Sequence, residues 1–364
     1  MTTTEWKVLQ MTSTVPVNTD VEQDPEARLR NRAKLIEMIG GYMAAHALGL
    51  AAELKIADRI HEGVHTSEEL AAATGAHEPS LRRMLRLLAS VGITTEPEPG
   101  RFGLTEVGAQ LRSDSPDSLY AFTRMFCHES HFSAWQGLAH SVRTGQSAWD
   151  HVFGKNIYAY LADLPELSEL FNVAMSQESR IAAGHIAAAY DFTGVRNVVD
   201  IGGGDGTLMS AILRANRHLT GVVFDSPSGV AQASDVLAEA GVGYRVTVVA
   251  GDFFESVPDG GELYIIKSVF QDWDDGPAKA ILRTCRAHMP ADAKLLIVGS
   301  VLPETAAQGE PIMFYTDMNM LVNSGGRERT ESHFRAMLEE TGFAVESVAL
   351  KAAGPLSMIE AVPV

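Results

Sequence analysis

The stretch VVDIGGGDG, residues 198–206, joins a short apolar run to a turn that contains four glycines. The residues that follow, TLMSAILRAN, have the composition of a helix. Glycines between a strand and a helix let a ligand approach the backbone closely, at the place where open parallel sheets bind ligands. The stretch therefore predicts an α/β domain that binds a nucleotide, in preference to a glycine turn that holds no ligand.

Four more strand-like segments follow the glycine turn. They are short apolar runs bounded by Gly, Pro or Asp, and helix-length sequence separates each from the next. Their sequences are LTGVVFDSP at 219–227, YRVTVVAGDFF at 244–254, ELYIIKSVF at 262–270 and AKLLIVGSVLP at 293–303. Alternation of this kind is typical of a parallel sheet with helices on both faces.

The chemistry of the turn favours one kind of nucleotide. Its pattern, G-x-G-x-G, lacks the third glycine spacing of the dinucleotide fingerprint G-x-G-x-x-G. Asp200 and Asp205 would repel a pyrophosphate, but they suit a ligand with a sulfonium and an ammonium group. Asp225, at the next strand end, can accept both ribose hydroxyls, and Asp252 beside Phe253 suits an adenine. We therefore predict S-adenosylmethionine as the cofactor.

Length and composition indicate a soluble globular protein with two domains. The chain has 364 residues, of which 46% are hydrophobic and 21% charged. It has neither an apolar run of about 18 residues nor a signal sequence, so we expect a cytoplasmic protein that contacts no membrane. A net charge of −17 disfavours nucleic acid and anionic membranes as partners. Cys127 and Cys285 have no metal-type spacing and are expected to be buried thiols.

The N-terminal part predicts a loose leader followed by an unusually apolar helical segment. Residues 1–28 show no periodicity, whereas residues 29–62 are helical and apolar on nearly all faces. A helix of this kind must be covered on every side. Because a monomer of this size has little surface to spare, we expect a second subunit to supply part of the cover.

A compact unit follows, with the pattern helix, turn, helix, hairpin. Thr66 and Glu69 form a capping-box pattern, and GITTEPEPGRFGLT at 92–105 predicts two strands around a Pro/Gly turn. The second helix places apolar residues at i, i+4 and i+7, namely Leu81, Leu85 and Leu88. This is the pattern of a winged helix, which often binds DNA. The exposed arginines Arg82, Arg83 and Arg86 could read a groove, but the acidic surroundings disfavour it.

Five segments stand in the order and spacing of a known family: VVDIGGGDG, VVFDSP, AGDFF, IIKSVFQDWDD and NSGGRERTESHFRAMLEETGF. By these segments the chain resembles the S-adenosylmethionine-dependent small-molecule O-methyltransferases of the plant caffeic-acid type and their bacterial relatives in antibiotic biosynthesis. The resemblance implies an α/β fold, with a Rossmann-like class I methyltransferase domain at 191–364. It also implies a helical, winged-helix dimerisation domain at 29–115, an acceptor-pocket segment at 116–190, a homodimer and an aromatic small-molecule acceptor.

The resemblance also implies the residues of two binding sites. Those for the cofactor are Ser179, Asp200, Gly202, Gly204, Asp225, Asp252, Phe253 and Lys267. Those for the acceptor are Met125, His131, Phe132, Trp135, Phe171, Met175, Asp272, Met313, Asp317, Asn319 and Met320. Met and aromatic residues at these spacings are more often ordinary core, so only the resemblance favours a binding role for them.

Gln271 stands where the family usually has a histidine that removes the acceptor's proton. Of the two glutamates that hold that histidine, the first falls on Gly299 and the second is kept as Glu328. The two losses look coupled, because a glutamate that orients a histidine has no task without it. Glu328 could retain a catalytic role or be only a first-turn carboxylate at a helix N-terminus.

Methyl transfer remains feasible without a base. Alignment of donor and acceptor can contribute about 7–11 kcal/mol, whereas a general base contributes about a hundred- to ten-thousand-fold in rate. We therefore expect an acceptor that is already nucleophilic: an acidic phenol or carboxylate, an amine, or an electron-rich carbon. His128 or His131 could handle other protons, and we favour no metal site there. The alternatives are a non-methylating relative that uses the cofactor for hydroxylation, decarboxylation or pericyclic chemistry, and a winged-helix transcriptional regulator.

Overall fold

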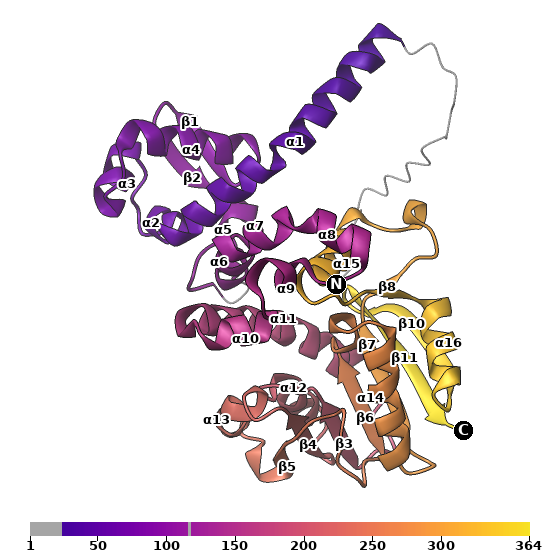
Figure 1. Ribbon diagram of the computed structural model, residues 1–364. Helices are drawn as coiled ribbons and strands as arrows, with labels where there is room; N and C mark the ends of the chain where they lie inside the picture. The colour runs from indigo at the N-terminus through magenta and orange to yellow at the C-terminus, as the bar shows by residue number, and fades with distance from the viewer. Residues whose placement is uncertain (1–23, 116–117) are drawn as a thin grey trace, which may run out of the picture.

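The computed structural model describes residues 24–115 and 118–364, which form an N-terminal helical unit, a helical middle segment and a C-terminal α/β domain (Figure 1). The middle segment contains α6 (Tyr120–Phe126), α7 (Glu129–Gln136), α8 (Leu138–Thr144), α9 (Ala148–Phe153), α10 (Ile157–Ala162) and α11 (Pro165–Ala189). Helix α11 packs on α6 within the middle segment and also on the C-terminal domain, so it connects the middle segment to that domain.

The C-terminal domain is built on a seven-stranded sheet in the order β10-β11-β7-β6-β3-β4-β5. The five predicted strands are confirmed and parallel, namely β3 (Asn197–Ile201), β4 (Thr220–Asp225), β5 (Val246–Ala250), β6 (Leu263–Lys267) and β7 (Lys294–Gly299). Helices α14 (Asp275–His288) and α16 (Glu331–Glu340) bury apolar side chains against one face. The other face is covered by α11, α12 (Thr207–Ala215) and α13 (Ala233–Glu239).

The expectation of a wholly parallel sheet is wrong at one edge. Strands β10 (Phe343–Ala353) and β11 (Leu356–Pro363) form a hairpin, and β11 pairs antiparallel with β7. Strand β10 is the outermost, and most of its side chains are exposed or half-buried. At this edge β10 needs no continuous apolar run, so its sequence lacks the signal by which the five parallel strands were recognised.

The winged unit has the predicted elements. It comprises α2 (Ile56–His61), α3 (Ser67–Thr74), α4 (Glu78–Ser90), β1 (Thr94–Glu98), β2 (Arg101–Leu104) and α5 (Glu106–Ala109). Both hydrogen bonds of the Thr66–Glu69 capping box are present, and the three predicted leucines of α4 are buried. Arg82 and Arg86 lie near the hairpin residue Glu96, with N–O distances of 3.9 and 3.1 Å. This carboxylate offsets the charge that a DNA-binding surface would require.

Helix α1 (Pro25–Glu53) begins four residues before Leu29, the predicted start of the helical segment. Asp24 caps it by accepting a hydrogen bond from the Glu26 amide, and Pro25 occupies the first turn, where its missing N–H costs nothing. Residues 1–23, the rest of the predicted leader, lie outside the described residues. Toward its C-terminal end α1 crosses α6 at Gly49, where a Cβ atom would lie 2.6 Å from the Cβ of Cys127. Cys127 is half-buried rather than buried, whereas Cys285 is buried as predicted.

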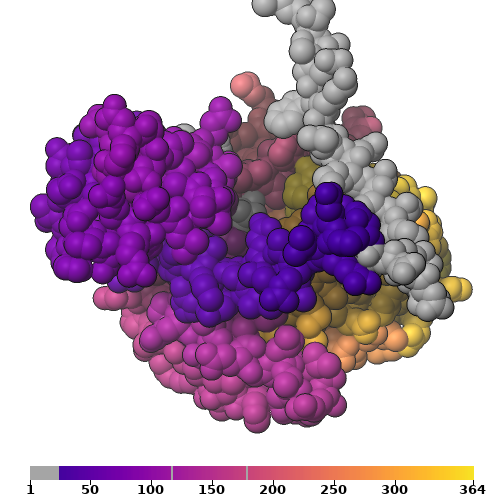
Figure 2. All heavy atoms as spheres, turned by 90° about the horizontal axis from the view of Figure 1, so that it is seen from above, coloured from indigo at the N-terminus to yellow at the C-terminus, as the bar shows by residue number. Residues whose placement is uncertain are grey.

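The N-terminal half of α1 extends away from the winged unit, and its apolar side chains are exposed (Figures 1 and 2). Ile36 and Ile39, for example, are 56% and 61% exposed. By length and composition α1 is also apolar enough to cross a membrane. An 18-residue stretch of it has a mean hydropathy of 1.3, and 22% of that stretch is buried inside the protein. The exposure agrees with the expectation that this helix is covered from outside the subunit.

We predict that the double variant Ile36→Asp/Ile39→Asp weakens self-association about tenfold or more, because each buried unpaired polar group costs roughly 1–3 kcal/mol. Analytical ultracentrifugation over a concentration series measures the effect. Val142→Asp is the control, since Val142 is an equally exposed apolar residue on α8. A wild-type protein that sediments as a monomer would contradict the expectation.

Candidate active site

The glycine turn lies at the carboxyl end of β3, between β4 and β6 in the sheet. The amides of Gly202 and Gly203 both donate to the carbonyl of Phe224 on β4, at 2.8 and 3.2 Å. Gly202 has a φ of 73°, and a Cβ atom there would lie 2.6 Å from a methyl group of Val269. Only glycine combines this conformation with so close a contact. The turn therefore keeps its backbone exposed at the sheet edge.

Asp200 is buried beneath this turn, and its Oδ2 atom has no hydrogen-bond partner. Burial raises the pKa of this carboxyl to about 7, Lys267 opposes the rise, and the charges of Asp225 and Asp205 add to it. A buried polar atom without a partner requires an explanation. A cationic group on a bound ligand would supply one, because it would stabilise the ionised carboxylate.

Asp225 occupies the end of β4, beside the turn. Its Oδ2 atom accepts from the Gly204 amide at 2.9 Å, and Oδ1 accepts from the Ser226 amide at 2.6 Å. These bonds orient the carboxylate, and each oxygen keeps acceptor capacity for a hydroxyl. Phe253, past the end of β5, lies edge-on to Trp273 with ring centroids 6.3 Å apart, and Asp252 beside it is exposed.

Helix α11 reaches across this region through two serines. The Ser176 hydroxyl donates to Asp205 Oδ2 at 3.0 Å, and the Lys267 ammonium donates to Ser179 Oγ at 3.3 Å. The predicted cofactor residues from β3, β4, β6 and α11 therefore lie around one turn. An unpartnered acid, close-approach glycines and an oriented carboxylate fit a ligand that carries an ammonium group, a sulfonium and a ribose, as S-adenosylmethionine does.

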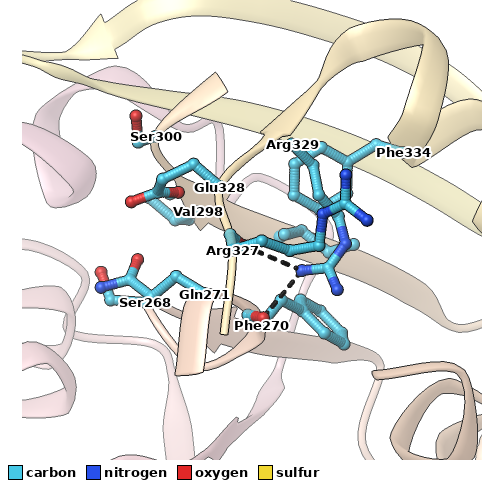
Figure 3. Close-up of a pocket in the computed structure, with 11 residues that line it drawn as sticks. Ser268, Phe270, Gln271, Val298, Ser300, Arg327, Glu328, Arg329 and Phe334 are labelled. Carbon is cyan, nitrogen blue, oxygen red and sulfur yellow. Dashed lines mark hydrogen bonds between the residues drawn. The ribbon is translucent and has the colours of Figure 1, made fainter. Parts of the chain in front are cut away.

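Gln271 lies in a short 3₁₀ turn (Phe270–Asp272) that follows β6. Together with Gly299 and Glu328 it lines a narrow cavity of about 10 Å³, close to the smallest volume that holds one water (Figure 3). A Cβ atom on Gly299 would meet nothing within 4 Å. The three positions that the family resemblance connects are thus adjacent, and the missing glutamate leaves open space.

Glu328 is only 6% exposed, and its Oε1 atom has no partner. Burial raises the pKa of its carboxyl to about 8, and the charges of Asp317 and Asp272 add to the effect. The alternative of a first-turn helix carboxylate is wrong: α16 begins at Glu331 and is capped by Thr330, so Glu328 precedes the helix. Its amide donates to Asp317 Oδ1 at 2.9 Å, which joins it to α15 (Pro311–Asn323).

The Gln271 turn is held by Arg329, which sequence reasoning missed. Its guanidinium is fully buried and donates to the carbonyls of Phe270 and Trp273, at 2.7 and 2.9 Å (Figure 3 shows the first bond). It also donates to Asp275 Oδ1 from Nε and Nη2, at 3.1 and 3.0 Å. In the sequence the residue belongs to a charged run that reads as solvent-exposed, so no signal distinguished it.

Tyr158 on α10 is a second residue that the sequence did not indicate. Its hydroxyl donates to Asp272 Oδ2 at 3.0 Å, which joins the middle segment to the residue next to Gln271. Burial raises the pKa of Asp272 to about 6, while Tyr158 and Lys267 oppose the rise. Nothing in the sequence around Tyr158 marks it as different from an ordinary surface tyrosine.

The predicted acceptor residues divide into two groups. On the active-site side, the Trp135 indole donates to Asn319 Oδ1 at 3.2 Å, and Phe171 lies edge-on to Tyr158. The predicted methionines Met175 of α11 and Met313 and Met320 of α15 are half-buried. Phe132 instead packs against His46 of α1, with ring centroids 3.9 Å apart, and Met125 is closed off from solvent.

The two histidines of the middle segment have different environments. His128 caps α7, because its Nδ1 accepts from the Ser130 amide at 3.2 Å. His131 is buried between the rings of Phe126 and Trp149, and neither of its ring nitrogens has a hydrogen-bond partner. Burial lowers the pKa of its imidazole to about 4. It is therefore neutral at physiological pH. Within residues 24–115 and 118–364 no group of three potential metal ligands occurs.

Two family models match this chain: an O-methyltransferase dimerisation domain over residues 36–114 and an O-methyltransferase domain over residues 135–344. The O-demethylpuromycin-O-methyltransferase of Streptomyces alboniger is 42% identical over 93% of this chain and 91% of its own. The phenazine O-methyltransferase of Lysobacter antibioticus is 44% identical, over 91% and 96%.

Other relatives include a structure solved with bound ligands and an N-methyltransferase. An O-methyltransferase from neocarzinostatin biosynthesis, solved with S-adenosylmethionine and 2-hydroxy-5-methyl naphthoic acid, has a TM-score of 0.77. Its sequence is 34% identical, over 88% of this chain and 96% of its own. The phenazine-1-carboxylate N-methyltransferase of Pseudomonas aeruginosa is 30% identical over 86% of this chain and 92% of its own. These relatives do not favour the non-methylating or the regulatory alternative.

We predict that Arg329→Met lowers the free energy of unfolding by about 3–5 kcal/mol, because the change leaves two carbonyls and a carboxylate without their buried cation. Urea unfolding measures the loss. Arg335→Met serves as the control, since Arg335 forms an exposed pair with Glu331 and should cost less than about 1 kcal/mol. Equal losses in the two variants would show that Arg329 has no special role.

Asp225→Ala should weaken the binding of S-adenosylmethionine at least about tenfold, since a hydrogen bond to a charged group is worth roughly 1.5–3 kcal/mol. Isothermal calorimetry gives the dissociation constant directly. Asp235→Ala removes an equal charge from the exposed face of α13 and should leave binding unchanged. An unaltered affinity in Asp225→Ala would rule out the nucleoside site described above.

Proposed function

Because this chain belongs to the S-adenosylmethionine-dependent O-methyltransferase family and is a methyltransferase, we propose that it methylates an aromatic small molecule of secondary metabolism without a histidine base. Relatives named for puromycin, phenazine and naphthoate substrates support an aromatic acceptor. The oxygen of a phenol or acid is the first choice of nucleophile. A nitrogen remains open because one relative is an N-methyltransferase.

The cofactor residues have separable roles in this proposal. Bound S-adenosylmethionine would supply an electrophilic methyl group on a sulfonium. Asp200 would pair with the ammonium group, which explains its unpartnered oxygen, and Asp225 would accept the ribose hydroxyls. Ser179 and Lys267, together at one side of the turn, suit the methionyl carboxylate. Phe253 would contact the adenine face, with Asp252 near its amino group.

The observation that carries the proposed mechanism is the set of residues around the small cavity. Gln271 replaces a titratable imidazole, and Gly299 leaves empty the place of a carboxylate that would orient one. The amide of Gln271 can donate to an acceptor oxygen or accept from a hydroxyl or N–H, so it can orient the acceptor without moving a proton. An ordinary phenol with a pKa near 10 carries a handicap of about 4 kcal/mol at pH 7. The acceptor must therefore be nucleophilic without help.

We further propose that the enzyme is a homodimer and acts in the cytoplasm. The exposed apolar face of α1 and the match to a dimerisation domain support the dimer. Nucleic acid is not proposed as a partner, because the chain is strongly acidic and Glu96 offsets the charge of two arginines of the winged unit.

Three carboxylates would face the acceptor rather than the cofactor, namely those of Asp272, Asp317 and Glu328.

We expect Gln271→Ala to reduce turnover only modestly, since orientation is lost but no proton transfer disappears. Gln271→His should not raise turnover by the hundredfold or more that a restored base would bring, because the new imidazole lacks its orienting carboxylate. Single-turnover rates over a pH series measure both effects, and the wild-type profile should have no limb that depends on residue 271.

The double variant Gln271→His/Gly299→Glu provides the matched comparison. A Cβ atom at residue 299 would meet nothing within 4 Å, so the backbone there tolerates substitution, and this variant restores both residues that the family usually has. It should raise turnover on a simple phenol at least about a hundredfold over Gln271→His. If Gln271→His alone gains several orders of magnitude, the native site is a damaged version of ordinary O-methylation, and the proposed adaptation is wrong.

A further inference from the structure

The carboxylates near the active site form two groups. Asp200, Asp205 and Asp225 surround the glycine turn, and the charges of Asp205 and Asp225 raise the pKa of Asp200. Asp272, Asp317 and Glu328 form the second group, from the Gln271 turn, α15 and the loop before β9 (Arg329–Thr330). The cofactor accounts for the first group. It does not account for the second, which lies on the side of Gln271.

The second group is more than a cluster of acidic residues, because one member is buried and unpartnered. Glu328 is 6% exposed, and its Oε1 atom has no hydrogen-bond partner. Its carboxyl lies beside the Gln271 amide, and both side chains extend toward the same side of the cavity (Figure 3). A buried acceptor atom in this position is expected to meet a donor on the ligand.

Two cations line the cavity beside this group, Arg327 and Arg329, and the Arg327 guanidinium lies 3.9 and 3.5 Å from the carboxylates of Asp274 and Asp275. Of the described residues that affect the pKa of Glu328, Arg329 is the only cation. It lowers this pKa, and its effect is the smallest of those that act on Glu328. Its guanidinium is already bound to Asp275 and to carbonyls of the Gln271 turn. Lys267 acts on Asp272, but it also interacts with Asp200 and Ser179. The group as a whole therefore keeps an excess of negative charge.

We propose that the acceptor carries a basic nitrogen, an amine or a protonated ring nitrogen, which binds against the carboxylates of Asp272, Asp317 and Glu328. The inference rests on the proposed function, because it assigns this side of the cavity to the acceptor. An ammonium group donates hydrogen bonds to carboxylates and neutralises their repulsion. A carboxylate in the same place would be repelled by the negative charge already there, so an acceptor with a negatively charged group at this position is disfavoured.

The charge state of Glu328 gives the inference a second signature. Its raised pKa, about 8, means that the free protein holds this proton at pH 7. An ammonium group beside it favours the ionised form, so binding should release up to one proton. The affinity for an amine should therefore rise as the pH increases from 6 to 8. Asp317 and Asp272 oppose ionisation of Glu328, and Arg329 favours it.

The test uses two matched probes and full-length protein saturated with S-adenosylhomocysteine. Dopamine and 3-(3,4-dihydroxyphenyl)propanoate share the catechol ring and differ in the charge of the side arm. Calorimetry should show dopamine binding at least about tenfold more tightly, as expected for hydrogen bonds to charged groups. Dopamine binding should also release a proton, seen as a dependence of the measured heat on the buffer's ionisation enthalpy.

Variants identify the residue responsible. Glu328→Gln keeps the size of the side chain and should reduce the preference for dopamine about tenfold and abolish the proton release. Glu339→Gln, an equal change on the exposed surface of α16, should alter neither. Circular dichroism and retained binding of S-adenosylhomocysteine establish that each variant is folded.

Three results would overturn the inference: equal or tighter binding of the propanoate, a preference that survives in Glu328→Gln, or no binding of either probe. The proposed function fails differently. If the wild-type protein did not bind S-adenosylmethionine or S-adenosylhomocysteine at all, the proposed function would be wrong. If the protein binds the cofactor but shows no preference between the probes, only the inference of a basic nitrogen on the acceptor is wrong.

Discussion

The buried guanidinium of Arg329 is the constraint on which the active site depends. The turn that carries Gln271 has carbonyls pointing into the protein, and such groups must be paired when buried. Arg329 pairs those of Phe270 and Trp273 and also holds Asp275 at the start of α14. Since Arg329 follows Glu328 directly, the same interaction sets the position of Glu328. Gln271 and Glu328, which we propose face the acceptor, are therefore held relative to each other by one cation.

The electrostatics of the site follow from burial. Asp200, Asp272 and Glu328 all have raised pKa values, and burial is the largest cause in each. Groups of this kind are costly in the free protein, and a ligand that supplies positive charge lowers the cost. The cofactor does this at the glycine turn. In the proposed mechanism Gln271 and Gly299 supply neither a base nor its orienting carboxylate, and the remaining carboxylates would serve in recognition and orientation.

The remaining elements position these groups. Helix α11 reaches the glycine turn and the end of β6 through Ser176 and Ser179, and α10 reaches Asp272 through Tyr158. The middle segment thus contacts both the cofactor side and the acceptor side of the site. The exposed apolar side chains of α1 agree with the match of residues 36–114 to a dimerisation domain.

The sequence alone determined the inner strands, the glycine turn and the capping box, because each depends on neighbours in the chain. It also indicated the Gln271, Gly299 and Glu328 positions through a family resemblance. The structure decided what depends on distant contacts: the antiparallel β10–β11 hairpin at one edge of the sheet, the buried Arg329 and the Tyr158–Asp272 bond. Edge strands carry no strong period, and a side chain's partner across 114 residues leaves no local pattern. Burial changes the meaning of a charged residue, and burial is a property of the fold.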